Sequence, residues 1–577
     1  MRQTTGIIIL EGLTGLVLLV GLGLGLIAWR LMSGPTDLAF VKSEIEAAMT
    51  EARDGKPVEI DKVSLRWQEG VNEFQVFAEG LEFYSAESEQ VASAQSAIID
   101  VHAVSLMRGK IRLKEMQVTG SELTIRREQD GTIIVAGEEI PPVRPVQFHE
   151  ATSPVQYVEQ SILNVVETIA QSSALDDLRR IRLDDFRINL QDVPLQIDWT
   201  LETAELDLIR AGSEVEIEFK GLAAGSGAPD RVAMELSFSP DGREFSSFAR
   251  LEGARVFELP FLKPYAEMIT GEMTADLEVS FGVRPQGIDA LALDLTTDGG
   301  RVVIAGETEL ELGRNDFALI FDLDANDLMI DGREINAGPV TGTGTLNIFD
   351  FVDLIETGFA NPTQLMLDAS ELGLDLRPSF ESAFELTNVN LDGEWNFQSS
   401  ELSFTEFAFN MENARVSSAG RIYLAEEMVH EEDLPFGVEL NANVSGALSV
   451  STVLEYWPVN LGAGAREWLI ENLHQGSVYE ADLKLDIEPQ SLRQGYLSNE
   501  NLQVDFLFRD GQFSFLSDMP PIVEGEGSAR LNGNSFSLDL ERAMFSGWTL
   551  TRGVVNIPYF MPKGEDLYIE ADGYGDI

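Results

Sequence analysis

Apolar and polar residues alternate with a period of two through most of the chain after residue 57. Segments such as Val215-Ile217-Phe219, Phe317-Leu319-Phe321-Leu323 and Val504-Phe506-Phe508 place apolar side chains at every second position. Successive side chains of a β-strand point to opposite faces, so each strand has one apolar and one polar face. With Gly, Asn and Asp turns between them, these segments predict roughly 25 to 30 strands in antiparallel meanders.

The number of strands restricts the architecture. An open twisted sheet rarely exceeds about ten strands without curling or splitting. The chain can therefore form several sandwiches with filled cores, or one sheet that curls along its length into a groove lined by its apolar face. The sequence has no strict internal period, so it does not support a solenoid of close repeats.

The longest apolar segment lies at the start of the chain. Residues 7–29 contain one charged residue, Glu11. As a helix this segment would be about 34 Å long, enough to cross a hydrocarbon core of about 30 Å. No Ala-x-Ala cleavage site follows it. We therefore predict an uncleaved transmembrane signal anchor, with the N-terminus in the cytoplasm and the bulk of the chain outside it.

Two further segments have the apolar spacing of helices. Residues 37–53 have it with Asp37 as a candidate N-cap, and residues 155–180 follow a proline-rich stretch at 141–154. The alternation of the strands also slips in phase near Glu115, which predicts a β-bulge or a short turn.

Composition excludes several classes of function. The 577 residues include 97 acidic and 40 basic side chains, for a formal net charge of −57, and no cysteine. Such a field repels nucleic acid, so we expect no nucleic-acid partner. Without cysteine there is no disulfide, thiolate metal site or cysteine nucleophile.

Motifs for catalysis or metal binding are missing as well. None of the four histidines lies in a zinc-binding arrangement, and the chain has neither a nucleophile elbow nor a P-loop. An EF-hand-like start at Asp322 has Asp327 where glycine is required and Arg333 where glutamate is required. We therefore expect no metal, no cofactor and no enzymatic activity.

One stretch, residues 454–478, interrupts the strand pattern. Within it, residues 465–473 predict a short helix with Trp468, Leu469 and Leu473 on one face, and Gly476 follows as a C-terminal breaker. From the residues alone, the simplest interpretation is a helix that plugs the edge or end of a sheet.

The same stretch resembles the YhdP family of AsmA-like proteins, through its Y-W-P, A-R-x-W, N-L and G-x-V elements. The signature residues in this chain are Tyr456, Trp457, Pro458, Arg466, Trp468, Asn472 and Gly476. Near the start, Val63–Trp67, Leu106–Leu113 and Leu123–Arg127 resemble the opening module of the same family. The resemblance spans nearly the whole chain, although most of it is generic β pattern.

The resemblance implies a fold and a role. Proteins of this family are anchored in the inner membrane of Gram-negative bacteria and project a long, curled β groove into the periplasm, which is thought to carry phospholipid acyl chains without a catalytic residue. Family members usually continue into a further C-terminal region, so the end of this chain at Ile577 suggests a truncated member.

Together these observations predict a mainly β fold: a long antiparallel sheet curled into an elongated groove, with an N-terminal transmembrane helix and a few short helices. The expected divisions are a membrane anchor (1–34), an N-terminal β module (35–140), a proline-rich linker with an amphipathic helix (141–182), a central β groove (183–450), and the signature segment with further strands (451–577).

The expected function is transport of phospholipids between the inner and outer membranes by a non-catalytic, single-pass inner-membrane protein whose bulk is periplasmic. The alternative is an envelope assembly or scaffold factor that pairs exposed strand edges with outer-membrane or other envelope proteins. Candidates for lining the groove are the large side chains of the apolar face: Trp199, Phe219, Phe238, Phe281, Phe321, Trp395, Phe508 and Phe515.

Overall fold

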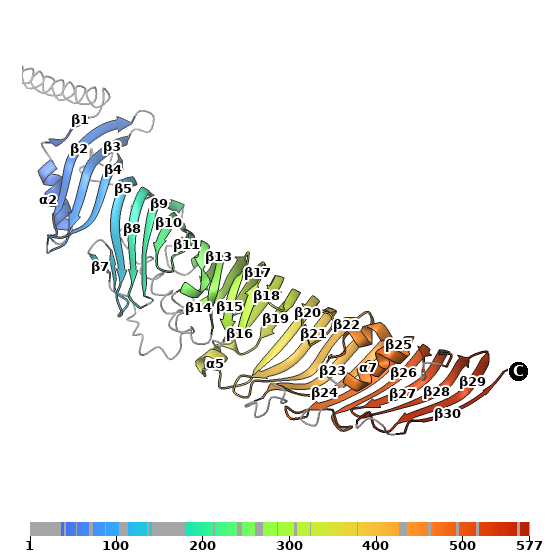
Figure 1. Cartoon of the computed structure of the whole chain (residues 1–577). Helices are drawn as coiled ribbons and strands as arrows, with labels where there is room; N and C mark the ends of the chain where they lie inside the picture. The colour runs from blue at the N-terminus through green and yellow to red at the C-terminus, as the bar shows by residue number, and fades with distance from the viewer. Residues whose placement is uncertain are drawn as a thin grey trace, which may run out of the picture. The chain divides into compact units, whose positions relative to one another are not determined.

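The protein, seen in a computed structural model, is mainly β with a few short helices (Figure 1). The structure describes residues 36–39, 42–52, 55–68, 73–86, 88–102, 113–135, 138–140, 179–194, 196–211, 214–238, 245–259, 269–284, 287–304, 308–322, 325–377, 379–425, 436–459, 463–491, 496–514, 519–561 and 566–575. None of the helices in these ranges is long and apolar enough to cross a membrane. The anchor predicted at 7–29 and nearly all of the helix predicted at 155–180 lie outside the described residues.

The chain divides into two compact units, Met1–Leu293 with Ile304–Glu307, and Asp294–Val303 with Thr308–Ile577. The elements up to β13 belong to the first unit, and β14 and β15 straddle the boundary. Their bounds are β1 Thr36–Asp37, α2 Lys42–Ala52, β2 Val58–Gln68, β3 Glu73–Tyr84, β4 Gln90–His102, β5 Leu113–Arg127, β6 Ile133–Val135, β7 Glu138–Ile140, β8 Arg180–Asp192, β9 Ile197–Ala211, β10 Glu214–Gly225, β11 Arg231–Phe238, β12 Phe245–Arg255, the 3-10 helix η3 Val256–Glu258, β13 Ile269–Arg284, β14 Gly287–Thr297 and β15 Gly300–Ile304.

The remaining elements belong to the second unit. They are β16 Thr308–Leu312, β17 Asn315–Asp322, β18 Asp327–Ala337, β19 Val340–Ile348, α5 Phe351–Glu356, β20 Thr363–Leu374, β21 Phe384–Asn396, β22 Glu401–Met411, β23 Asn413–Leu424, β24 Phe436–Ser449, α6 Val450–Glu455, α7 Ala463–Asn472, β25 Leu473–Ile487, β26 Leu502–Phe513, β27 Ile522–Asn532, β28 Ser535–Phe545, β29 Trp548–Ile557 and β30 Tyr568–Tyr574.

Within the described residues most strands pair with their neighbours in sequence, but β13 also pairs with β15, β14 with β17 and β16 with β18. From β18 to β30 each strand pairs antiparallel with the next. In the first unit, however, β5 pairs with β8 in parallel, from Glu115 opposite Arg180 to Arg127 opposite Asp192. The prediction of a purely antiparallel sheet is therefore wrong at this pair. Parallel neighbours need a long crossover connection, and the more than 50 residues between β5 and β8 supply one.

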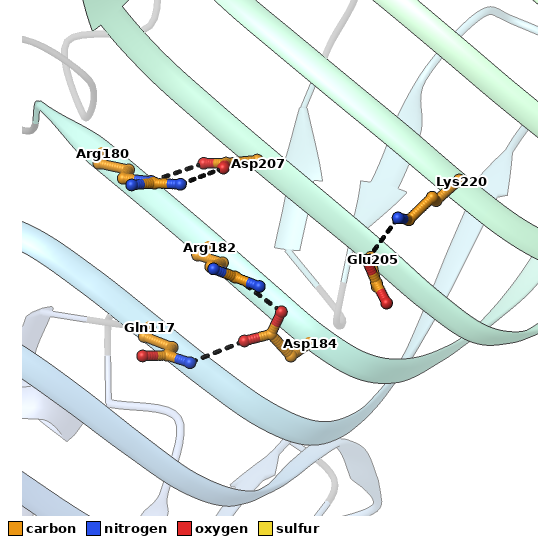
Figure 2. A network of polar contacts seen from close by, with 7 residues as sticks. All are labelled: Gln117, Arg180, Arg182, Asp184, Glu205, Asp207 and Lys220. Atoms are coloured by element: carbon orange, nitrogen blue, oxygen red, sulfur yellow. Dashed lines mark hydrogen bonds and ion pairs between the residues drawn. The ribbon is translucent and has the colours of Figure 1, made fainter.

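Polar side chains bridge the strands around this parallel pair (Figure 2). The Asp184 carboxylate on β8 accepts hydrogen bonds from Gln117 Nε2 on β5 at 2.7 Å and from Arg182 Nε at 2.8 Å. Burial acts to raise the pKa of Asp184, but these hydrogen bonds outweigh burial and hold it below its usual value. The bridges continue across β8, β9 and β10, where Arg180 donates to Asp207 and Lys220 pairs with Glu205 at 2.9 Å.

The first strands form a core that α2 covers. Leu38, Ile45 and Met49 pack against a cluster that includes Ile60 and Val63, each at most 2% exposed. The helix was predicted to begin at Asp37, but it begins at Lys42, because Thr36 and Asp37 pair with β2 as a short strand. The Asp37 carboxylate accepts from the backbone N–H of Ala39 at 2.9 Å, which forms a turn before the helix.

Mid-strand bulges interrupt the ladders in both units. The predicted slip near Glu115 is confirmed, since the register with β4 shifts by one residue there. In the first unit Asp185 on β8 and Thr203 on β9 adopt positive φ angles of 51° and 48°, where the register between the two strands also shifts. A bulge bends its strand and increases the local twist. These bulges therefore add local bending to a sheet that already twists.

In the second unit one sheet face is apolar along β20 to β29. Buried residues of β20–β24 form a cluster that includes Ala369 and Val389, and those of β26–β29 form a second that includes Ala543. Within the described residues only short helices, among them α5, α6 and α7, accompany these strands. Many side chains of the apolar face therefore stay partly exposed, as along β26.

Candidate functional site

A cavity of about 430 Å³ lies on the apolar face of the second unit, between the α6–α7 segment and β24–β28. Its floor consists of alternate residues from these strands, and α6, α7 and the connection after α6 form its cover. The lining residues are Val444, Leu448, Val450, Val453, Leu454, Tyr456, Trp457, Pro458, Leu469, Leu473, Gly476, Ser477, Val478, Ala481, Leu483, Leu485, Leu497, Leu502, Val504, Phe506, Phe508, Gly511, Phe513, Ala529, Leu531, Asn532, Gly533, Phe536, Leu538 and Phe560.

The cavity is uncharged. Although 24% of the chain is charged, no Asp, Glu, Lys, Arg or His is among the lining residues, and Ser477 and Asn532 are the lining residues with a polar side chain besides Tyr456 and Trp457. Burial raises the pKa of Tyr456, so its phenol is neutral at physiological pH. The lining can therefore contact hydrocarbon well, but it has no group to activate a nucleophile or hold an ion.

Bulges shape the floor of the cavity. Glu480 on β25, Asp510 on β26 and Glu524 on β27 adopt φ angles of 49°, 54° and 53°, and each marks a shift in register with the next strand. These acidic residues are exposed, whereas Ala481 beside Glu480 and Gly511 beside Asp510 line the cavity. The bends therefore hollow the sheet beneath α6 and α7 while the charges stay in solvent.

Gly476 permits a close approach of two strands at this hollow. It has a φ of 146°, and a Cβ atom added there would lie 3.2 Å from the Cα of Gly511 on β26. The prediction that Gly476 ends the helix is wrong, because α7 ends at Asn472 and Gly476 lies within β25. Its role is to let β25 and β26 bend together at the cavity floor.

The cover begins with α6, which the sequence analysis missed. The Ser449 hydroxyl caps this helix by accepting from the backbone N–H of Thr452 at 3.1 Å. The helix contacts β24 and β25 and sends Val450, Val453 and Leu454 to the cavity. The Ser449-x-x-Thr452 pattern could have indicated the cap, but the strand alternation of β24 runs directly into it.

The Tyr-Trp-Pro element joins the cover to β21. The Tyr456 ring stacks on Phe384 with centroids 4.7 Å apart and planes at 23°. The backbone N–H of Val459 then donates to the carbonyl oxygen of Ser379 at 2.9 Å. These two contacts hold the connection after α6 against the start of β21. Trp457 and Pro458 of this connection line the cavity.

Arg466 fixes α7 to the same region. Its Nη2 lies 2.6 Å from Glu381 Oε1 and donates to the carbonyl oxygen of Leu454, at the end of α6, at 3.1 Å. Arg466 is 8% exposed, whereas the Glu381 side chain is 54% exposed. The Nε of Arg466 has no hydrogen-bond partner within the described part of the chain. One guanidinium therefore links both helices of the cover to the loop before β21.

The structure places the predicted lining candidates in different surroundings, and those of the first unit are mostly packed against other apolar side chains. In the first unit, Trp199 and Phe219 are each 8% exposed within packed apolar residues, with Phe219 edge-on to Phe186 at 6.1 Å. Phe281 is partly buried, 5.6 Å from Phe245. Phe238 ends β11, and its side chain is not described.

In the second unit, Phe508 lines the cavity. Phe321 lies edge-on to Phe351 of α5 at 5.6 Å, and Trp395 lies 6.0 Å from Phe397. Phe515 lies outside the described residues.

The signature residues gather around the cover. Tyr456, Trp457, Pro458 and Gly476 line the cavity, and Arg466 holds the cover in place. The helix predicted at 465–473 is confirmed as α7, whose last residue is Asn472; the side chain of Trp468 is not described. Sequence reasoning missed the floor residues of β24, β27 and β28, although their alternation was visible.

Comparison with known proteins gives a match to one family model over part of the chain. The family model described as YhdP protein matches residues 350–577, which confirms the resemblance over the part of the chain that contains the cavity. The searches of curated proteins and of solved structures found no match to this chain. No group of side chains suited to holding a metal ion occurs among the residues that the structure describes.

Proposed function

We propose that this chain, whose residues 350–577 match the family model described as YhdP protein, is a non-catalytic lipid conduit. In this proposal a transmembrane anchor at 7–29 holds it in the inner membrane, and its apolar sheet face forms a periplasmic groove that carries phospholipids between the inner and outer membranes. The uncharged cavity of about 430 Å³ supports the proposal most strongly.

The physical basis is desolvation of acyl chains. Each methylene group moved from water to an apolar surface contributes about 0.8 kcal/mol. A sheet with one apolar face can provide such a surface over many strands while its acidic face stays hydrated. The phospholipid headgroup would remain in water at the rim, so transport needs no binding pocket for it.

Phospholipid that co-purifies with the full chain tests the proposal. We expect lipid extraction and mass spectrometry to find phospholipid on the wild-type protein. Phe321→Asp, on the apolar face, should lower the amount, whereas Ile320→Asp, at the adjacent position that is 37% exposed, should not. Circular dichroism checks that both variants fold. A folded wild-type protein without lipid would refute the proposal.

A second candidate is the envelope scaffold factor. Strand β30 pairs with β29 through one edge, and all seven of its residues are exposed, including Tyr568 and Tyr574. In this function an unpaired strand edge of the sheet would accept a strand from another protein. A lipid-free but folded protein would favour this function.

A further inference from the structure

We propose that the α6–α7 cover converts the open apolar face into an enclosed site for one acyl chain of one phospholipid. This inference rests on the proposed function and adds a specific place and stoichiometry to it. On β20–β24, Val453 and Tyr456 of the cover pack against the buried cluster, so the cover contacts the apolar face beyond the cavity as well. Under α6 and α7, seven residues from Val450 to Leu469 add a second wall to the floor of β24–β28.

The size of the cavity fits a single hydrocarbon chain. A methylene group is about the size of a water molecule, which occupies about 30 Å³ in the liquid, so a cavity of about 430 Å³ holds about 14 such groups. This volume takes about 14 carbons of one acyl chain, and any longer part of that chain would extend onto the open apolar face. The second chain of the same lipid would lie on the open apolar face beside the cavity.

Charge favours a phospholipid over a free fatty acid as the occupant. The chain has a formal net charge of −57, and among the described residues no basic side chain lines the cavity to pair with a carboxylate. A fatty acid anion would therefore meet repulsion without compensation. A zwitterionic headgroup has no net charge and can remain at the hydrated rim.

Two contacts hold the cover to residues that do not line the cavity. Arg466 joins α7 and the end of α6 to Glu381, and Tyr456 stacks on Phe384. Neither Glu381 nor Phe384 lines the cavity, so these contacts fix the cover without occupying space that an acyl chain needs. Arg466 is thus a positioning residue for the site.

Photo-crosslinking in the full chain can test the enclosed site. Leu469 on the underside of α7 lines the cavity, whereas the next residue, Ile470, is 49% exposed. We would replace each with p-benzoylphenylalanine, purify the protein with its native lipids, irradiate it, and measure intact masses. The expected result is an adduct of one phospholipid at 469 and at least a tenfold lower yield at 470. An adduct of a free fatty acid, or equal yields at the two positions, would overturn the inference.

A third probe distinguishes the site from the groove. Phe407 on β22 lies on the apolar face but does not line the cavity. Phospholipid adducts at 407 without adducts at 469 would refute the enclosed site and leave the conduit standing; no adduct at either position would refute both. Ala481→Phe, which fills the cavity floor, should abolish the adduct at 469 and preserve that at 407. If this variant does not fold, the comparison of 469 with 470 still decides.

Discussion

Removing the exposed partner of the Arg466–Glu381 pair should loosen the cover more than removing the buried one. Arg466 is 8% exposed, and its Nε already has no partner among the described residues. In Glu381→Ala the guanidinium stays buried and loses its counter-ion. In Arg466→Met the stem is replaced by an apolar side chain of similar length, and Glu381, whose side chain is 54% exposed, is solvated by water.

The structure sets the expected magnitudes. Removing one partner of a fully buried ion pair costs about 3–5 kcal/mol. Because half of the Glu381 side chain is exposed, solvent screening reduces this, and we expect about 2 kcal/mol for Glu381→Ala. In Arg466→Met the hydrogen bond from Arg466 to the Leu454 carbonyl oxygen is lost. That oxygen still accepts a hydrogen bond from the backbone N–H of Trp457, so it is not left without a partner. We expect less than about 1 kcal/mol for that variant.

Hydrogen exchange of the full chain, read by mass spectrometry at residues 450–472, measures this local effect. A loss of about 2 kcal/mol corresponds to exchange about 30-fold faster. The double variant should exchange like Arg466→Met alone, because no buried charge is then left unpaired. Faster exchange in Arg466→Met than in Glu381→Ala, or additive effects, would show that the pair does not act through a buried charge.

Two more predictions concern strain and titration. Thr203 is a β-branched residue at a φ of 48°, so Thr203→Asn, which tolerates this conformation, should stabilise the first unit by about 1 kcal/mol in calorimetry, whereas Thr203→Val should not. The hydrogen bond from Arg530 holds the pKa of Asp505 below its usual value. The ionised Asp505 carboxylate therefore stabilises the fold at pH values above its pKa in the unfolded chain, and this stabilisation is lost as the pH falls through its pKa in the folded protein. Arg530→Gln should return the pKa of Asp505, measured by NMR, toward 3.8, and an unchanged value would refute the assignment.

The sequence was sufficient for the β fold because the period of two is a local property. Strands such as β10 and β26 could be placed from alternation alone, and the bulge near Glu115 from a break in it. The short helix α7 was also visible, because its spacing differs from that of the strands around it. Each of these features depends on residues a few positions apart.

Alternation did not predict three other features. These are the parallel pairing of β5 with β8, the position of Gly476 inside β25, and the cover over the cavity. Alternation states which side chains share a face, but it does not say whether solvent, a second layer or a helix lies against that face. That choice depends on contacts between residues far apart in the chain, such as Tyr456 on Phe384 and Arg466 on Glu381. The sequence therefore determined an apolar sheet face, and only the tertiary structure decided where that face is enclosed.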